Sequence, residues 1–201
     1  MPITLVNEDF VLGLNNASYA ARALVAKFEP FFDALSLDRY AFQREAMRRA
    51  LLYFSSENYA DTSALATEHF NATDKLRAHF ATQPDYLAKF SLRDRKAISL
   101  DLATGAGKSF VLYGIARTAL AMGLVDKVLV LCPSLTIEEG LKDKFRQLSA
   151  RQDLKQIMES LGAVYPNPPI KSANDPILDG DICVENIHAV YDRTGSSISD
   201  S

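Results

Sequence analysis

Residues 97–122 read AISLDLATGAGKSFVLYGIARTALAM: an apolar run, a glycine-containing loop and a stretch with helical spacing of apolar residues. The run over 97–102 predicts a strand, and the spacing after the loop predicts a helix that Gly123 ends. A loop between a strand and a helix suits phosphate groups, because glycines let the backbone wrap an anion and the helix directs free N–H groups at it. The sequence therefore predicts a nucleotide-binding loop.

The expected roles within this loop follow from the side chains. Lys108 can reach the β- and γ-phosphates and is the predicted catalytic residue, and the hydroxyl of Ser109 can ligate Mg²⁺. The complete set of predicted nucleotide-binding loop residues is Ala103, Thr104, Gly105, Ala106, Gly107, Lys108 and Ser109. ATP with Mg²⁺ is the cofactor pair that this reading implies.

The rest of the chain predicts an α/β fold behind a helical region. KVLVLCP (127–133) is an uninterrupted apolar run, typical of a parallel strand covered on both faces, and DICVE (181–185) is a further strand. Strand, helix, strand and helix in succession predict a parallel sheet with right-handed crossovers. Four prolines between 163 and 180 predict a long connection, and the polar stretch 193–201 predicts a tail.

The first ninety or so residues read as helical. A helix is expected through residues 18–28, with Asn16 or Ser18 as its cap and Pro30 ending or kinking it. Short helices with little periodicity are expected over residues 55–90. A second clear helix carries one apolar stripe, formed by Phe42, Ala46, Met47, Ala50, Leu51 and Phe54.

Composition and charge limit the classes of function. With 48% hydrophobic and 23% charged residues, the 201-residue chain is expected to fold, and no apolar run is long enough for a membrane span. The net charge of −3 argues against a stand-alone nucleic-acid-binding module, whose surface is usually basic. Two distant cysteines, the lack of a secretory signal and three histidines without metal-binding spacing are typical of a cytoplasmic protein without a structural metal.

The stretch LATGAGKS (102–109) resembles motif I of superfamily 2 helicases, A-x-T-G-x-G-K-T. Leu102 stands where the general P-loop pattern has a glycine, and this superfamily tolerates an apolar residue there. RYAFQREAM (39–47) resembles the upstream adenine motif, although Tyr40 stands where an arginine is common. The resemblance implies that Gln43 binds the adenine edge and favours ATP over GTP. A glutamine on an exposed helix surface is the alternative.

A third stretch, VLVLCPSLTIEEGL (128–141), resembles motif Ia of the same superfamily. The resemblance implies that Pro133, Ser134 and Thr136 contact a nucleic-acid backbone at the start of a helix. A capping box between Thr136 and Glu139 would give the same pattern without nucleic acid. DICVENIHAVY (181–191) resembles the strand and loop that follow in this domain, without residues specific enough to assign.

Together these stretches resemble a DEAD/DEAH-type superfamily 2 enzyme over residues 37–192, nearest to the restriction (helicase) subunit of type III restriction systems. The resemblance implies an incomplete RecA-like P-loop parallel sheet flanked by helices over residues 96–201, preceded by a helical N-terminal region over residues 1–95. It also implies a nucleic-acid partner, DNA in preference to RNA, and the remaining helicase lobes.

One element of such an enzyme is missing. A helicase hydrolyses ATP with a second strand ending in Asp-Glu, and this dipeptide does not occur in the sequence. We therefore expect a fragment of a longer protein that binds ATP without hydrolysing or unwinding anything alone. A P-loop ATPase of another class, such as an AAA+ motor, and a non-catalytic nucleotide-binding module stay open as alternatives.

Overall fold

The computed structural model of the protein describes residues 4–36, 40–172 and 174–188. The chain forms two compact units. The helical unit combines residues 1–25 with 48–101, and the sheet unit combines residues 26–47 with 102–201. The predicted tail at 193–201 lies outside the described residues, and the predicted division at residues 95 and 96 stays a prediction.

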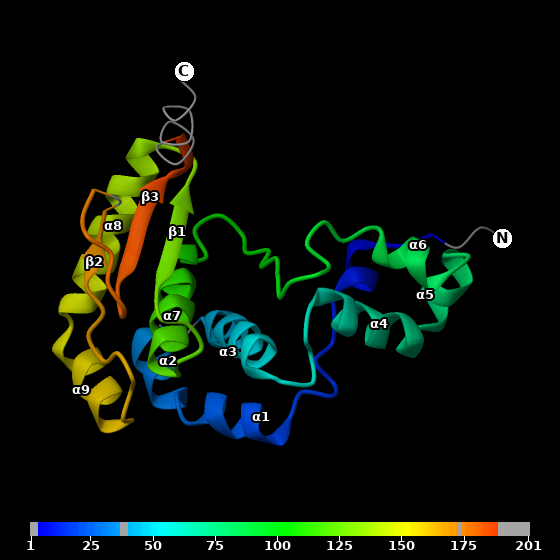
Figure 1. Ribbon diagram of the computed structural model, residues 1–201, viewed down its shortest axis with the longest axis horizontal. Helices are drawn as coiled ribbons and strands as arrows, with labels where there is room; N and C mark the ends of the chain where they lie inside the picture. Colours follow the sequence, from blue (N-terminus) through cyan, green and yellow to red (C-terminus); the bar gives the residue numbers. More distant parts are fainter. Residues whose placement is uncertain (1–3, 37–39, 173, 189–201) are drawn as a thin grey trace, which may run out of the picture. The chain divides into compact units, whose positions relative to one another are not determined.

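The helical unit is built from short helices with local caps (Figure 1). They are η1 (Asn7–Phe10), α4 (Thr62–Ala72), α5 (Asp74–His79) and α6 (Gln83–Leu87), together with most of α1 (Tyr19–Ala26) and the second half of α3 (Ala41–Ser55). Asp61 caps α4 by accepting a hydrogen bond from the backbone N–H of Ala64 at 2.8 Å. The prediction of short helices between residues 55 and 90 is therefore confirmed.

Tyr86 lies at the centre of an aromatic core in the helical unit. Its fully buried ring packs against those of Phe70, Phe80 and Phe90, with centroid distances of 5.6, 5.3 and 5.2 Å. Its hydroxyl lies 2.9 Å from Nδ1 of the half-buried His69. Burial raises the pKa of Tyr86 to about 12, so this hydroxyl stays protonated at neutral pH.

The strand predicted at residues 97–102 is wrong, because this segment forms no strand. Residues 97–101 lie in the helical unit, where the backbone N–H of Ala97 donates to Oγ1 of Thr62 at 3.1 Å. The side chains of Ile98 and Leu100 are each 39% exposed, and both line a pocket of the same unit. Local contacts with α4 thus replace the predicted sheet pairing.

The sheet unit contains a parallel sheet with the strand order β1-β3-β2. The strands are β1 (Val128–Cys132), β2 (Ile170–Lys171) and β3 (Ile182–Asn186). The helices are α2 (Glu29–Leu35), α7 (Lys108–Ala121), α8 (Leu135–Ala150) and α9 (Gln152–Ser160), together with the first half of α3. In register, Val128 pairs with Ile182 and Cys132 with Asn186. The strands over 127–133 and 181–185, the helix after the loop and the long connection are confirmed.

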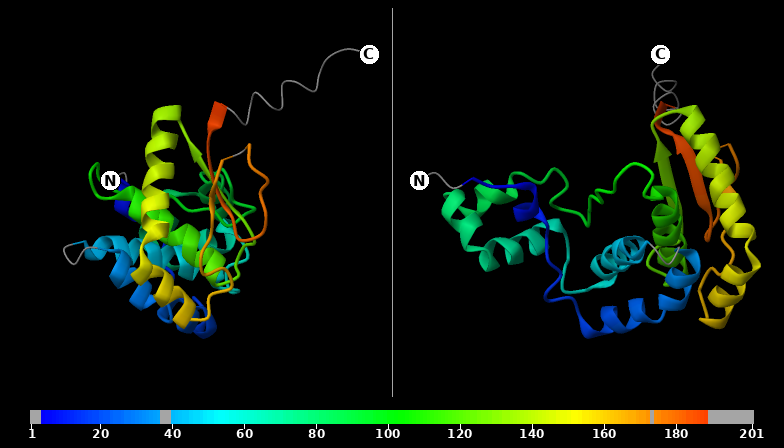
Figure 2. Two further views of the ribbon diagram at one scale, coloured as in Figure 1. Left: turned by 90° about the vertical axis from the view of Figure 1, so that its left-hand side faces the viewer. Right: turned by 180° about the vertical axis from the view of Figure 1, so that it is seen from behind.

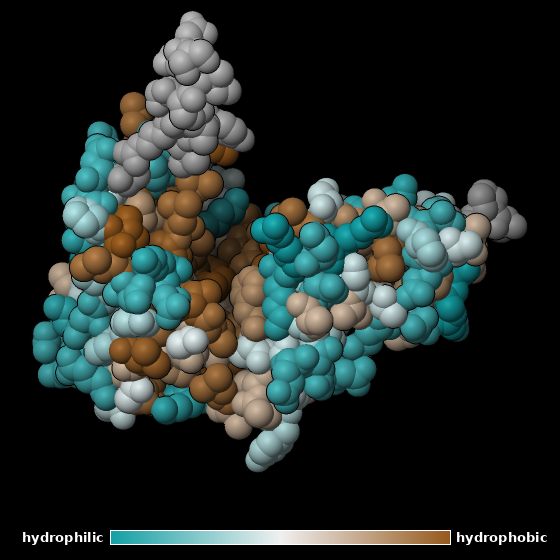
Figure 3. Space-filling model, in the orientation of Figure 1, coloured by the Kyte–Doolittle hydropathy of each residue, from teal (hydrophilic) through white to brown (hydrophobic). Residues whose placement is uncertain are grey.

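Helix α8 runs along the sheet and packs on all three strands (Figure 2). On β1, Val130 and Cys132 are buried, whereas Leu129 and Leu131 are 57% and 46% exposed. Figure 3 shows the resulting apolar surface over β1 and α7. The prediction that β1 is covered on both faces is therefore wrong for the described residues, since only one face carries buried side chains.

The starts of two helices differ from the sequence expectations. Helix α8 begins at Leu135, and its cap is Ser134, whose hydroxyl accepts from the N–H of Ile137 at 3.4 Å. Thr136 lies inside the first turn, so the predicted capping box is wrong. Pro30 occupies the first turn of α2, where a missing N–H costs nothing, so it begins a second helix after α1 has ended.

Arg117 joins α7 to the rest of the sheet unit. Its guanidinium is fully buried and donates to the Tyr113 hydroxyl at 2.7 Å, the Pro166 carbonyl at 2.8 Å and the Leu154 carbonyl at 3.4 Å. It also lies 5.5 Å from the ring centroid of Phe31 on α2. Among the described residues no carboxylate pairs with this cation, and its Nε has no hydrogen-bond partner.

Replacing Arg117 should therefore destabilise the sheet unit. Arg117→Lys keeps a buried charge but loses the fork of donors, so we expect a loss of about 1–3 kcal/mol in the free energy of unfolding. Arg117→Met should cost less, because it removes the desolvated charge together with the donors. Urea titrations would measure both, with the exposed Arg146→Lys as the control; wild-type stability of Arg117→Lys would contradict this role.

His69 makes the stability of the helical unit depend on pH. Burial lowers the pKa of His69 below its ordinary value of 6.5, and the nearby Asp9 carboxylate only partly opposes this. The unfolded chain therefore takes up this proton first as the pH falls, which favours the unfolded state. We expect stability to be full above about pH 7 and to decrease below pH 6.5 until the folded pKa is passed.

Thermal unfolding between pH 5 and 7.5 would measure this dependence. His69→Gln should flatten the part of the profile below pH 6.5. An identical profile for His69→Gln and the wild-type protein would refute the assignment.

Candidate nucleotide site

The predicted nucleotide-binding loop forms a tight turn directly before α7. The backbone N–H of Ala106 donates to the Ala103 carbonyl at 3.1 Å, and α7 begins at Lys108. Gly105 and Gly107 have φ angles of +80° and +76°, which side-chain-bearing residues rarely adopt. The two glycines are therefore required by the backbone of the turn.

The loop is open to an anion. Thr104, Gly105 and Lys108 are exposed, and a side chain added at Gly105 would meet no atom within 4 Å. Gly107 is the N-cap of α7 and provides no side-chain capping hydrogen bond. The first N–H groups of this 14-residue helix thus point, with the positive end of the helix dipole, into a region that a phosphate can enter.

Gln43 contacts this loop directly. Its side chain is only 2% exposed, and its Nε2 donates to the carbonyl of Ala106 at 2.7 Å. A Cβ atom at Gly107 would overlap Nε2 of Gln43, so the glycine also makes room for the amide. The alternative of an exposed surface glutamine is excluded, whereas adenine binding by Gln43 stays a prediction.

The position of Gln43 changes the expected face of α3. The buried side chains of the helix include Gln43, Met47, Ala50 and Leu51, whereas Phe42 is 41% exposed. The predicted apolar stripe is thus confirmed for Met47, Ala50 and Leu51 and wrong for Phe42, while its other two members are half-buried. The buried face of the helix is rotated by one position toward the glutamine. Gln43 is buried where hydrophobicity alone predicts burial of Phe42.

Phe110 is a loop neighbour that the sequence did not indicate. Its ring lies 3.5 Å from the position of a Cβ at Gly107, and its backbone N–H donates to the Gly107 carbonyl at 2.9 Å. The ammonium of Lys144 on α8 lies 4.6 Å from the ring centroid. This cation–π contact links α8 to the first turn of α7, and no spacing pattern in the sequence predicts it.

Ser109 lies at the place expected for a magnesium ligand, at the end of the loop. It follows Lys108 in the first turn of α7, and it is half-buried at the end of the loop. A hydroxyl at this place would complement phosphate oxygens and water in the oxygen shell that Mg²⁺ prefers. The metal would supply positive charge to the phosphates, while this chain would contribute the Ser109 oxygen.

The predicted nucleic-acid contacts lie where β1 ends. Pro133 and Thr136 are exposed and Ser134 is half-buried, and the three residues connect Cys132 to the first turn of α8. Leu135 and Ile137 in the same turn are 65% and 51% exposed. The start of α8 is therefore accessible, and nucleic-acid binding there stays a prediction.

Glu138 fixes the start of α8 against the sheet. Its buried carboxylate accepts from the Asn186 backbone N–H at 3.1 Å, from Asn186 Nδ2 at 3.0 Å and from Lys142. The hydrogen bond from Lys142, with those from Asn186, holds the pKa of Glu138 below its ordinary value. Its charge is thus neutralised locally, which reduces the repulsion a phosphate would meet at this turn.

The family of the chain follows from a comparison with protein-family models. The model described as type III restriction enzyme, res subunit, matches residues 37–199, which is more than half of the chain and includes Gln43 and the loop. No curated protein and no solved structure matches the chain significantly. In the described part of the chain, no helix is long and apolar enough to cross a membrane.

The contact between Gln43 and Gly107 is testable with paired substitutions. Gly105→Ala meets only the conformational penalty of a positive φ, which is about 1–2 kcal/mol. Gly107→Ala meets a similar penalty and also the overlap with Gln43, so it should lower the free energy of unfolding further. Gln43→Ala in the Gly107→Ala background should recover this difference. Equal losses for both alanine variants in urea titrations would contradict the contact.

Proposed function

Because the chain belongs to the type III restriction enzyme res subunit family, we propose that it is the ATP-binding part of a nucleic-acid-dependent ATPase. The family membership gives a helicase-like ATP-binding domain of a restriction-type system. The finer assignment is a helicase or translocase of a restriction or phage-defence system that acts on DNA. The observation that supports ATP binding is the open turn at residues 103–109, where Nε2 of Gln43 donates to the Ala106 carbonyl at 2.7 Å.

The charges and hydrogen-bond donors of this turn support the proposed nucleotide binding. Lys108 contributes an exposed ammonium for the β- and γ-phosphates, and the backbone N–H groups at the start of α7 contribute neutral donors. Gln43 has a donor and an acceptor in one side chain, which suits the adenine edge. Since Nε2 has two hydrogens, it can donate one to the base while the other stays on the Ala106 carbonyl.

Binding and hydrolysis are separate in this proposal. The turn supplies positioning and positive charge, whereas hydrolysis needs a carboxylate to hold Mg²⁺ and orient water. The sequence has no Asp-Glu dipeptide to supply this group. The isolated chain is therefore proposed to bind ATP with Mg²⁺ and not to turn it over.

The nucleic-acid surface of this proposal is the first turn of α8. A phosphate could reach this turn, because Pro133 and Thr136 are exposed and the N–H groups of the turn are donors. The carboxylate of Glu138 is paired with Lys142, which reduces its repulsion of a phosphate. The remaining lobes of the helicase are the expected protein partners. Neither Cys132 nor Cys183 forms a disulfide bond, which suits the reducing cytoplasm that we propose as the location.

Titration with a fluorescent ATP analogue and Mg²⁺ tests the nucleotide site. Lys108→Ala should weaken binding by about tenfold or more, since a charge-assisted phosphate contact contributes about 1.5–3 kcal/mol. Gln43→Ala should weaken ATP more than GTP and remove the preference of the wild-type chain for ATP. Lys155→Ala on α9 is the charge-matched control.

Other outcomes separate the parts of this assignment. A loss caused by Lys108→Ala alone would leave a nucleotide loop without adenine recognition by Gln43. Steady, Lys108-dependent release of phosphate by the purified chain would contradict the separation of binding from hydrolysis. Wild-type affinity in Lys108→Ala would contradict the nucleotide site itself.

A further inference from the structure

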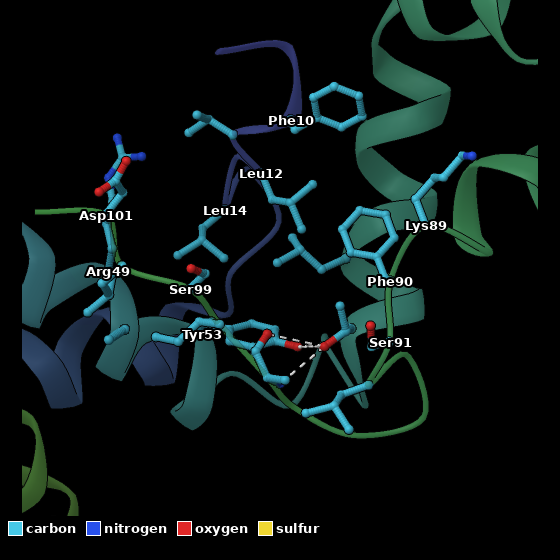
Figure 4. A pocket seen from close by; sticks show the side chains of 18 residues that line it. Phe10, Leu12, Leu14, Arg49, Tyr53, Lys89, Phe90, Ser91, Ser99 and Asp101 are labelled. Carbon is cyan, nitrogen blue, oxygen red and sulfur yellow. Dashed lines mark hydrogen bonds between the residues drawn. The ribbon is translucent and has the colours of Figure 1, made fainter. Parts of the chain in front are cut away.

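The helical unit contains a pocket that is separate from the nucleotide loop (Figure 4). Its volume is about 710 Å³, within the range of about 300–1,000 Å³ of clefts that hold small organic groups. Its walls come from residues 10–14, the second half of α3, the first turns of α4, residues 89–92 and residues 97–101. All of these segments belong to one compact unit.

The interior of the pocket is apolar and partly aromatic. Phe10 and Phe90 lie on one side of it in Figure 4, and the ring of Tyr53 lies at its base. Leucine side chains at residues 12, 14 and 65 complete the apolar wall. Tyr53 is held in place by a hydrogen bond between its hydroxyl and Oγ1 of Thr62 at 3.1 Å. Such a surface suits a flat ring, which loses little on leaving water.

Polar groups stand at the two ends of the pocket. Arg49 and Asp101 lie at one end in Figure 4, and Lys89 lies at the opposite end. A guanidinium and a carboxylate together supply a donor and an acceptor, which is the combination that the hydrogen-bonding edge of a nucleobase needs. The ammonium at the other end suits a phosphate. From one end to the other, the pocket thus offers polar groups for a base edge, apolar side chains for the ring and an ammonium for a phosphate.

Additional positive charge lies on the loop beside the pocket. Residues 89–96 read KFSLRDRK, with four basic side chains and one acidic one. Lys96 is used structurally, since its ammonium donates to the carbonyls of Ser56 at 2.8 Å and Phe54 at 3.0 Å. Arg93 and Arg95 are exposed. The loop is therefore locally basic in a chain whose net charge is −3.

We propose that this pocket binds one unstacked base of a single-stranded nucleic acid, with the adjoining phosphates on Lys89 and the basic loop. The proposal rests on the proposed function, because it names a second contact of the same nucleic-acid partner. Stacking on aromatic side chains does not depend on the base, so binding should tolerate most sequences. Residues 97–101 form one wall and continue directly into the nucleotide loop, so a bound base would contact the segment that precedes Ala103.

Fluorescence anisotropy with a labelled 15-nucleotide single strand tests this site, beside a strand of equal length in which every sugar lacks its base. The intact strand should bind about 5- to 150-fold more tightly than the abasic strand, since stacking contributes about 1–3 kcal/mol per base. Ile98→Trp fills the pocket from a side chain that is already 39% exposed, and it should remove this difference. Leu178→Trp, at a residue 65% exposed in the sheet unit, is the matched control.

Lys89→Ala should weaken binding of both strands and reduce the dependence of affinity on salt, because it removes a phosphate contact. Lys27→Ala, an exposed lysine of the sheet unit, is its control. Equal affinity for intact and abasic strands, or unchanged binding in Ile98→Trp, would overturn the proposal. So would the absence of strand binding by the wild-type chain.

Two further measurements distinguish this proposal from others. Binding of the fluorescent ATP analogue is measured in the same variants, so a wild-type nucleotide site with failed strand binding overturns the pocket and leaves the nucleotide assignment. Anilinonaphthalene sulfonate reports apolar cavities. If Ile98→Trp abolishes binding of this dye while strand binding is unchanged, the pocket has been filled without loss of strand affinity, and the base assignment is wrong.

Discussion

The buried guanidinium of Arg117 is the interaction on which the sheet unit depends. An arginine is always charged in a folded protein, and a buried charge is costly unless its donors are satisfied. Here two carbonyls, one hydroxyl and two aromatic rings surround it, from α2, α7, α9 and the connection that follows α9. The carbonyls of Leu154 and Pro166 are fixed by their own backbone, so their hydrogen bonds with Arg117 fix the position of α7, which begins at the nucleotide loop.

The loop itself is controlled from its other side by Gln43. A turn with two positive φ angles has few internal hydrogen bonds, so its shape depends on outside contacts. The amide of Gln43 provides one through the Ala106 carbonyl, and the absence of a side chain at Gly107 makes that approach possible. Nε2 carries two hydrogens, so the amide can keep its contact with the loop and donate the second hydrogen to an adenine edge. One side chain thus holds the loop and carries the proposed base contact.

The sequence predicted what depends on local pattern. Glycine spacing placed the loop, and apolar runs placed β1 and β3, because these features are set within a few residues. The strand at 97–102 was wrong, since its apolar side chains line a pocket of the helical unit, and pattern alone does not choose between two apolar surroundings. Gln43 and Arg117 were not recognised as buried, because burial of a polar group is decided by partners distant in sequence, such as Ala106 and Pro166.

The two proposed sites are joined by two stretches of chain. Helix α3 carries Gln43 and, seven residues later on the same helix face, Ala50, which lines the pocket. Residues 97–101 line the same pocket and lead to the loop. A ligand couples two sites only through states that it binds unequally. A base in the pocket would contact both stretches, so coupling requires that its contacts differ between the nucleotide-bound and the nucleotide-free loop.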